Sequence, residues 1–123
     1  MNLKIIQKQM MFDDVMFVIN KAELSKVSKT NLDGVYDTSL KLTDVKFNLG
    51  GHTCSLGSEE YNMKLSQKRA LAVKDYLVMK GVKAELISTE AFGELKPAFP
   101  NKTEKERSKN RRTDIKAFYI EKQ

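Results

Sequence analysis

The hydrophobic residues of this chain form short clusters separated by polar stretches, and their spacing predicts where strands lie. Residues 15–19 are a continuous apolar run of branched and aromatic side chains, too short for an average helix, and they predict a buried strand. Residues 44–49 alternate apolar and polar positions and predict a strand with one buried face, stopped by the glycine pair 50–51. The same alternation returns at residues 113–120 and predicts the last strand.

Two longer segments have helical spacing. Apolar residues recur roughly every three or four positions over residues 22–42, with Ser25 as the expected N-cap and Gly34 as a weak point inside the helix. The second helix is expected to begin after Ser58, which is followed by two glutamates, and to end at Gly81.

The remaining stretch predicts a short strand within residues 86–92, a proline-containing loop near residue 96 and a charged helical turn over residues 102–109. The predicted order is therefore strand, helix, strand, helix, strand, short helix, strand. This order is typical of an α/β two-layer sandwich with helices on one face of a mixed sheet. No internal repeat or composition shift divides the chain, so residues 1–123 are expected to form a single domain.

Length and composition agree with that expectation. A chain of 123 residues with 41% hydrophobic content can bury a substantial core. Its net charge of +6 favours anionic partners. The first 17 residues contain no uninterrupted apolar run, because Lys4 and residues 7–9 interrupt it, so they predict neither a signal peptide nor a membrane span. We expect either a cytosolic protein or a domain whose leader or anchor lies outside this sequence.

The single His and the single Cys, His52 and Cys54, raise the question of a chemical site. A zinc site would need further ligands, and the chain has no other His or Cys to supply them. A cysteine nucleophile is not supported either, because no protease signature surrounds Cys54 and Glu60 stands where a Cys-x5-Arg motif would place its arginine. We therefore predict no metal, no cofactor and no catalytic residue. The residues themselves indicate that His52 is a partly buried strand-end side chain hydrogen-bonded to a loop, and that Cys54 is a small filler.

The basic residues of segment 102–112 could indicate a nucleic-acid partner. However, Glu104, Glu106 and Asp114 are interleaved with them or follow directly, and no stacking aromatic side chain lies among them. We expect a solvated face and no nucleic-acid binding.

Three spaced motifs appear in order along the chain: GHTCSLGSEEYNMKLSQKRA, then ISTEAFGELKPAFPNKT, then RSKNRRTDI. Together they resemble the OmpA-like domain, the C-terminal module shared by OmpA, MotB and peptidoglycan-associated lipoprotein, and the resemblance is strongest over residues 15–115. In that family the loop after the second strand reads Gly-His-Thr-Asp-x-x-Gly, and the next helix carries Asn, Leu-Ser and Arg-Ala. The positions in register here are Gly51, His52, Thr53, Gly57, Asn62, Leu65, Ser66, Arg69 and Ala70.

The resemblance implies a non-enzymatic, periplasmic module that binds peptidoglycan without a covalent bond, through the diaminopimelate of the stem peptide. It implies membrane contact only through an anchor outside this chain. In the family an Asp takes the ammonium group and an Arg takes the carboxylate. Arg69 matches that Arg, and a guanidinium can hold a carboxylate by two parallel hydrogen bonds. A solvated helix arginine or an internal ion pair are the alternatives for Arg69. By resemblance the ligand site comprises Asn20, Thr53, Cys54, Asn62, Leu65, Arg69 and Arg112.

The chain departs from the family pattern at two acidic positions. Cys54 stands where the family has its ammonium-binding Asp, and Val18 stands where the first strand usually has another. A thiol is mostly uncharged at neutral pH, so it cannot balance an ammonium as a carboxylate does. Removing one partner of a buried charge pair costs about 2 to 5 kcal/mol, or roughly thirty- to several-thousand-fold in affinity. Two interpretations stay open: weakened peptidoglycan binding, or a degenerate domain that serves protein–protein interaction or assembly.

Overall fold

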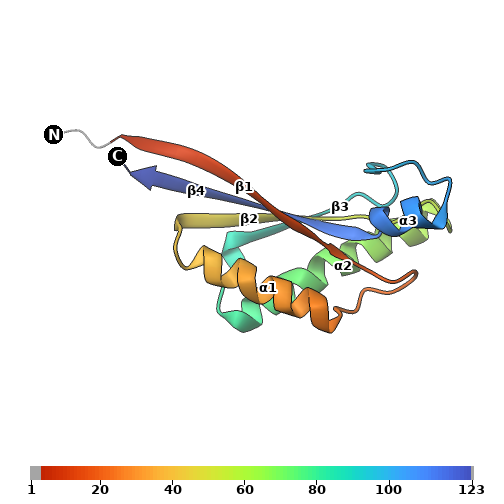
Figure 1. The fold of residues 1–123 in the computed structure, drawn as a ribbon, viewed down its shortest axis with the longest axis horizontal. Coiled ribbons are helices and arrows are strands. Elements are labelled where there is room, and N and C mark those ends of the chain that lie inside the picture. Colours follow the sequence, from red (N-terminus) through yellow and green to blue (C-terminus); the bar gives the residue numbers. More distant parts are fainter. Residues whose placement is uncertain (1–3, 123) are drawn as a thin grey trace.

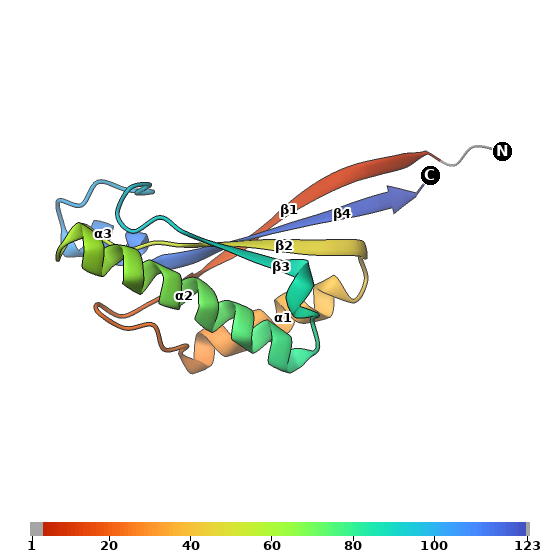
Figure 2. The same ribbon diagram turned by 180° about the vertical axis from the view of Figure 1, so that it is seen from behind.

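The computed structural model describes residues 4–122, which form a two-layer arrangement of one sheet and its helices. The sheet has four strands in the order β1-β4-β2-β3, in which β4 pairs antiparallel with β1 and β2, and β2 pairs parallel with β3. The two long helices cover one face of the sheet (Figures 1 and 2). The predicted fold class is confirmed. The elements are β1 (Ile5–Met16), α1 (Lys26–Ser39), β2 (Thr43–Gly51), α2 (Glu59–Lys80), β3 (Ile87–Ala91), α3 (Glu104–Asn110) and β4 (Arg112–Lys122), with a short 3-10 turn at Ala84–Leu86.

The helix ends follow the local signals in the sequence. Ser25 and Ser58 are the N-caps of α1 and α2, and each side-chain hydroxyl accepts a hydrogen bond from the backbone N–H three residues further on. Gly81 ends α2 with a positive φ of 130°, a conformation that favours glycine. Helix α1 begins after Ser25, the expected N-cap, and ends at Ser39, before the predicted end at residue 42.

The first strand differs from the prediction of a buried run over residues 15–19. Strand β1 begins at Ile5 and ends at Met16, and the side chain of Val18 is 67% exposed. The chain turns after Phe17, where the Lys21 N–H donates to the Val18 carbonyl over 3.0 Å. Residues 15–17 therefore alternate between buried and exposed side chains, and the turn begins after them.

The core lies between the sheet and the two long helices. It consists of apolar side chains from every strand and from α1 and α2. The buried members are Val15, Phe17, Leu32, Val35, Phe47, Leu49, Ala70, Val73, Leu77, Val82, Ile87, Ile115 and Ala117. Strand β2 and helix α2 approach most closely at Gly51, where an added Cβ would lie 1.8 Å from the Ser66 carbonyl oxygen. The end of β2 is thereby held against the first half of α2.

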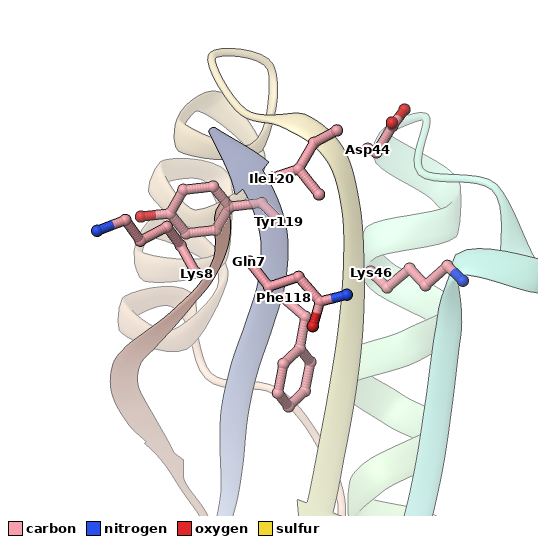
Figure 3. A pocket seen from close by; sticks show the side chains of 7 residues that line it. All are labelled: Gln7, Lys8, Asp44, Lys46, Phe118, Tyr119 and Ile120. Atoms are coloured by element: carbon pink, nitrogen blue, oxygen red, sulfur yellow. The ribbon is translucent and has the colours of Figure 1, made fainter. Parts of the chain in front are cut away.

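The other face of the sheet carries no helix. Phe118 of β4 is 42% exposed, whereas Ile115 and Ala117 on the same strand are buried. This side chain contributes to a hollow of about 390 Å³ (Figure 3), lined by Gln7, Lys8, Asp44, Lys46, Phe118, Tyr119 and Ile120. The hollow lies near the start of β2, whereas the family motif begins where β2 ends.

Candidate ligand-binding site

The residues that the resemblance implies come together at one end of the molecule. They lie on the loop that follows β1, the loop that follows β2, the first half of α2 and the start of β4 (Figure 1). The antiparallel pairing of β4 with β2 brings the Arg112 carbonyl to the backbone N–H of His52, at 2.8 Å. Segments far apart in sequence therefore meet at this end.

A cleft of about 380 Å³ lies between the loop after β1 and helix α2. Two of the expected residues, Asn20 and Leu65, line it. The Tyr61 hydroxyl donates a hydrogen bond to Oδ1 of Asn20 over 3.2 Å, and it thereby connects α2 to the loop on the opposite wall. The full lining is Asn20, Lys21, Ala22, Glu23, Tyr61, Lys64, Leu65 and Lys68.

Arg69 lies behind this cleft, and its side chain has no exposed surface. The guanidinium donates to the carbonyl oxygens of Lys21 at 2.9 Å and Val18 at 3.1 Å, both on the loop after β1. A third bond, of 2.9 Å, goes to the carbonyl of His52. Burial lowers the pKa of Arg69 to about 10. Arg69 is thus not solvated and, within residues 4–122, forms no ion pair; it fastens the two loops to α2.

Cys54 is a buried thiol beside a second arginine. Its Sγ lies 4.0 Å from Nη1 of Arg111, a residue that the sequence did not indicate as part of the site. The same Nη1 is 2.7 Å from a carboxylate oxygen of Glu104, and Nε donates to the Phe17 carbonyl over 3.3 Å. Burial disfavours the charged guanidinium, but the Glu104 carboxylate outweighs it and raises the pKa of Arg111. The position of the family Asp is therefore occupied by a thiol, which supplies no carboxylate beside Arg111.

Asn62 and Thr53 hold the loop after β2 in place. The Asn62 side-chain amide donates to the Cys54 carbonyl at 3.3 Å and to the Glu94 carboxylate at 3.4 Å. The backbone N–H of Thr53 donates to the Gly93 carbonyl over 2.8 Å. The Asn62 side chain and the Thr53 backbone thus position the loop, and neither residue lines the cleft.

Arg112 and His52 each lie beside an aspartate next to the site. Arg112 donates to the Lys96 carbonyl at 3.2 Å, and its Nε lies 3.7 Å from the Asp14 carboxylate. Nε2 of His52 is 2.7 Å from Asp114 of β4, so the ring bonds a strand residue and not the expected loop. Burial disfavours the Asp114 carboxylate, but its hydrogen bond with His52 and the nearby charges of Arg112 and Lys116 together lower the pKa of Asp114.

Three lysines of the cleft were not anticipated. Lys64 and Lys68 are one helical turn apart on α2, and Lys21 lies on the opposite wall. Lys64 and Lys68 have i, i+4 spacing, as do Tyr61 and Leu65 beside them. This spacing was the signal that could have placed the two helical lysines on one face of α2.

Among residues 4–122, no group of three or more His, Cys, Asp and Glu side chains is arranged to hold a metal ion. No helix there combines the length and the apolar composition that crossing a membrane requires.

Comparison with known proteins identifies relatives over most of the chain. The model of the OmpA family matches residues 16–111. Outer membrane protein A of Bordetella avium is 40% identical over 102 residues, which cover 83% of this chain and 53% of that protein. Outer membrane protein A of Klebsiella aerogenes is 45% identical over 91 residues, or 72% of this chain and 26% of that protein. The chain thus spans about half or less of the length of these relatives.

Several solved structures have the same fold. The peptidoglycan-associated lipoprotein of Burkholderia pseudomallei superposes with a TM-score of 0.79 at 25% identity, over 88% of this chain and 89% of that one. The C-terminal domain of Helicobacter pylori MotB also gives 0.79, at 22% identity over 89% and 84% of the two chains, and supports the fold alone. The cell wall anchor of the type VI secretion system (T6SS) of Pseudomonas aeruginosa gives 0.73 at 26% identity, over 85% and 75%.

Proposed function

Since this chain belongs to the OmpA family, we propose that it is a non-catalytic module of the bacterial cell envelope that binds peptidoglycan through the diaminopimelate of the stem peptide. The observation that carries the proposal is the cleft between the loop after β1 and helix α2, which is open at the position of the family motif. The names of two structural relatives, a peptidoglycan-associated lipoprotein and a cell wall anchor, support the same ligand. A periplasmic location follows from this proposal.

In this proposal the expected site residues divide into two groups. Asn20 and Leu65 contact the ligand from the walls of the cleft. Arg69 supplies positive charge behind the wall, and direct contact with a carboxylate requires the loop at Val18 and Lys21 to move. Thr53, Asn62 and Arg112 act through the loops that they hold, and Cys54 stands at the position of the family's ammonium-binding acid.

We propose that binding is weak, because no carboxylate occupies position 54. Calorimetric titration of a diaminopimelate-containing muropeptide at neutral pH and low salt tests this in the native domain and in Cys54→Asp. The variant is expected to bind at least thirty-fold more tightly, since it restores the acidic partner of the ammonium group. Cys54→Ser is the matched control, because it changes the thiol without adding charge. Equal affinities of the native domain and Cys54→Asp would refute the role given to Cys54.

A protein–protein or assembly role is the second candidate, and the geometry of Arg69 favours it. Three N–H groups of Arg69 already donate to backbone carbonyls, so the side chain does not present a free fork to a carboxylate. If neither the native domain nor Cys54→Asp binds the muropeptide or sedimented sacculi, the peptidoglycan proposal fails and this candidate takes its place.

A further inference from the structure

The cleft lining carries an excess of positive charge, which comes from the α2 wall. Lys21, Lys64 and Lys68 line it, whereas Glu23 is the single acidic residue of the lining. Lys64 is 3.3 Å from the carboxylate of Glu60, which compensates part of its charge. Among residues 4–122, Lys21 and Lys68 take part in no ion pair, so two ammonium groups are available to an incoming anion.

The layer behind the cleft adds to the same potential. The buried guanidinium of Arg69 donates to the Lys21 carbonyl in the cleft wall and forms no ion pair within the described residues. Arg111 lies close enough to lower the pKa of Arg69 further, after burial has done so. The thiol of Cys54 beside Arg111 brings no carboxylate to this layer. A charge that is shielded from water acts over a longer range than an exposed one.

From these charges we infer that the cleft selects a carboxylate that has no ammonium group next to it, an inference that rests on the site of the proposed function. A zwitterion bound in the cleft would place its ammonium group among Lys21, Lys64 and Lys68. Charges of the same sign repel one another there. The ligand class is then a peptide carboxylate whose neighbouring amine is absent or acylated. A protein C-terminus and a cross-linked stem peptide both meet this description.

Two small dicarboxylates of equal chain length test the inference. Pimelate and diaminopimelate differ only in the two ammonium groups, and each can be titrated into isotopically labelled domain while cleft amide resonances are followed by NMR. Pimelate is expected to shift the resonances of Lys21, Tyr61 and Lys68, with a dissociation constant at least about fivefold lower than that of diaminopimelate. Equal affinities, or tighter binding of diaminopimelate, would overturn the inference.

Charge variants show whether the cleft is responsible. Lys21→Gln and Lys68→Gln are each expected to weaken pimelate binding several-fold. The matched controls are Lys8→Gln and Lys46→Gln, which remove a lysine from the hollow on the other face of the sheet and should leave binding unchanged. Cys54→Asp is expected to reduce the preference for pimelate. If the four lysine variants lose affinity equally, the attraction comes from net charge and the inference is wrong.

Sedimentation with purified sacculi separates this inference from the proposed function. Sacculus binding together with a preference for diaminopimelate overturns the inference and leaves the function intact. Pimelate binding without sacculus binding supports the inference and overturns the proposed function. An N-acetylated peptide with a free C-terminus and a cross-linked muropeptide, titrated in parallel, then distinguish the two sources of the carboxylate.

Discussion

The guanidinium of Arg69 is shared among three carbonyl oxygens that belong to two loops. Val18 and Lys21 lie on the loop after β1, and His52 lies on the loop after β2. The planar head group can serve all three because its N–H groups point in fixed directions in one plane. It also lies over the ring of Phe17, at 5.2 Å from the centroid, which supports the charge where water is absent.

Arg69→Lys is expected to lower the free energy of unfolding by about 2 kcal/mol or more. Lysine keeps the charge but cannot reach three carbonyls in one plane, so buried acceptors lose their partners. Urea unfolding followed by circular dichroism measures the change. The control is Lys68→Ala, an exposed neighbour on the same helix, which should stay within about 0.5 kcal/mol of the native domain.

The bond between His52 and Asp114 predicts a dependence of stability on pH. Because the pKa of Asp114 is lower in the folded state, its carboxylate stabilises the fold above about pH 4 and loses that effect as the pH falls through the folded-state pKa. Asp114→Asn should therefore be less stable than the native domain at pH 7 by about 1 kcal/mol, and the gap should close toward pH 2. Urea unfolding at a series of pH values measures the gap.

Asp75→Asn, on the exposed side of α2, is the matched control for the loss of one carboxylate. A gap between the native domain and Asp114→Asn that stays constant from pH 7 to pH 2 would contradict the role assigned to the Asp114 carboxylate.

Side-chain partners within one turn could be read from the sequence, whereas distant partners could not. Ser25 and Ser58 were predicted as caps because a cap requires only the next three residues. The partners of Arg69 lie 17 to 51 positions away, and nothing in the local pattern specifies a bond to a carbonyl at that separation. The family motif predicted that Arg69 belongs to this end of the fold, but not that its donors are already occupied.

At the scale of elements, two glycines differ in whether the fold leaves room for a Cβ atom. Gly51 lies where β2 meets α2, and a Cβ there would overlap the Ser66 carbonyl. Gly34 lies inside α1 with nothing within 4 Å of an added Cβ. The first glycine sets the distance between a strand and a helix, and the second only weakens its own helix.

Gly51→Ala is expected to destabilise the domain by about 3 kcal/mol or more, because backbone must shift to admit the methyl group. Gly34→Ala should stabilise it by roughly 0.5 to 1 kcal/mol through the better helix propensity of alanine. Thermal unfolding of the two variants under one set of conditions gives both signs. A small effect of Gly51→Ala would mean that β2 and α2 are not in close contact.

Strand β1 shows why the first element was mispredicted. Its first half contains Gln7, Lys8 and Gln9, and these side chains are exposed because no helix packs over this end of β1. The ribbon of β1 and β4 extends past the helix layer (Figures 1 and 2). Since burial is what produces a hydrophobic pattern, a strand without a helix layer over it carries little signal.

At the scale of the whole molecule, the helices cover only one face of the sheet, and two phenylalanines distinguish the faces. Phe47 is 1% exposed on the covered face, whereas Phe118 is 42% exposed on the open one. Phe47→Ala should cost about 3 to 5 kcal/mol of unfolding free energy. Phe118→Ser should cost less than about 1 kcal/mol, as surface substitutions do. Denaturant unfolding compares them, and a large loss in Phe118→Ser would indicate that the open face is covered in solution.

The order of elements was predictable from the sequence because each strand and helix that contributes to the core has its own period of apolar residues. The covering of one face followed from that order. The cleft was not predictable, since its walls come from the loop at Asn20 and the helix at Leu65. Their approach depends on Arg69 and on the Tyr61 bond to Asn20, which are contacts across the fold.

Arg69 also bears on how motif matches in such domains are interpreted. In this domain Arg69 joins both loops to α2 without any ligand in the cleft. The contacts that Arg69 makes within the fold are therefore a sufficient reason for an arginine at this position. A match at Arg69 alone is not evidence of a bound carboxylate.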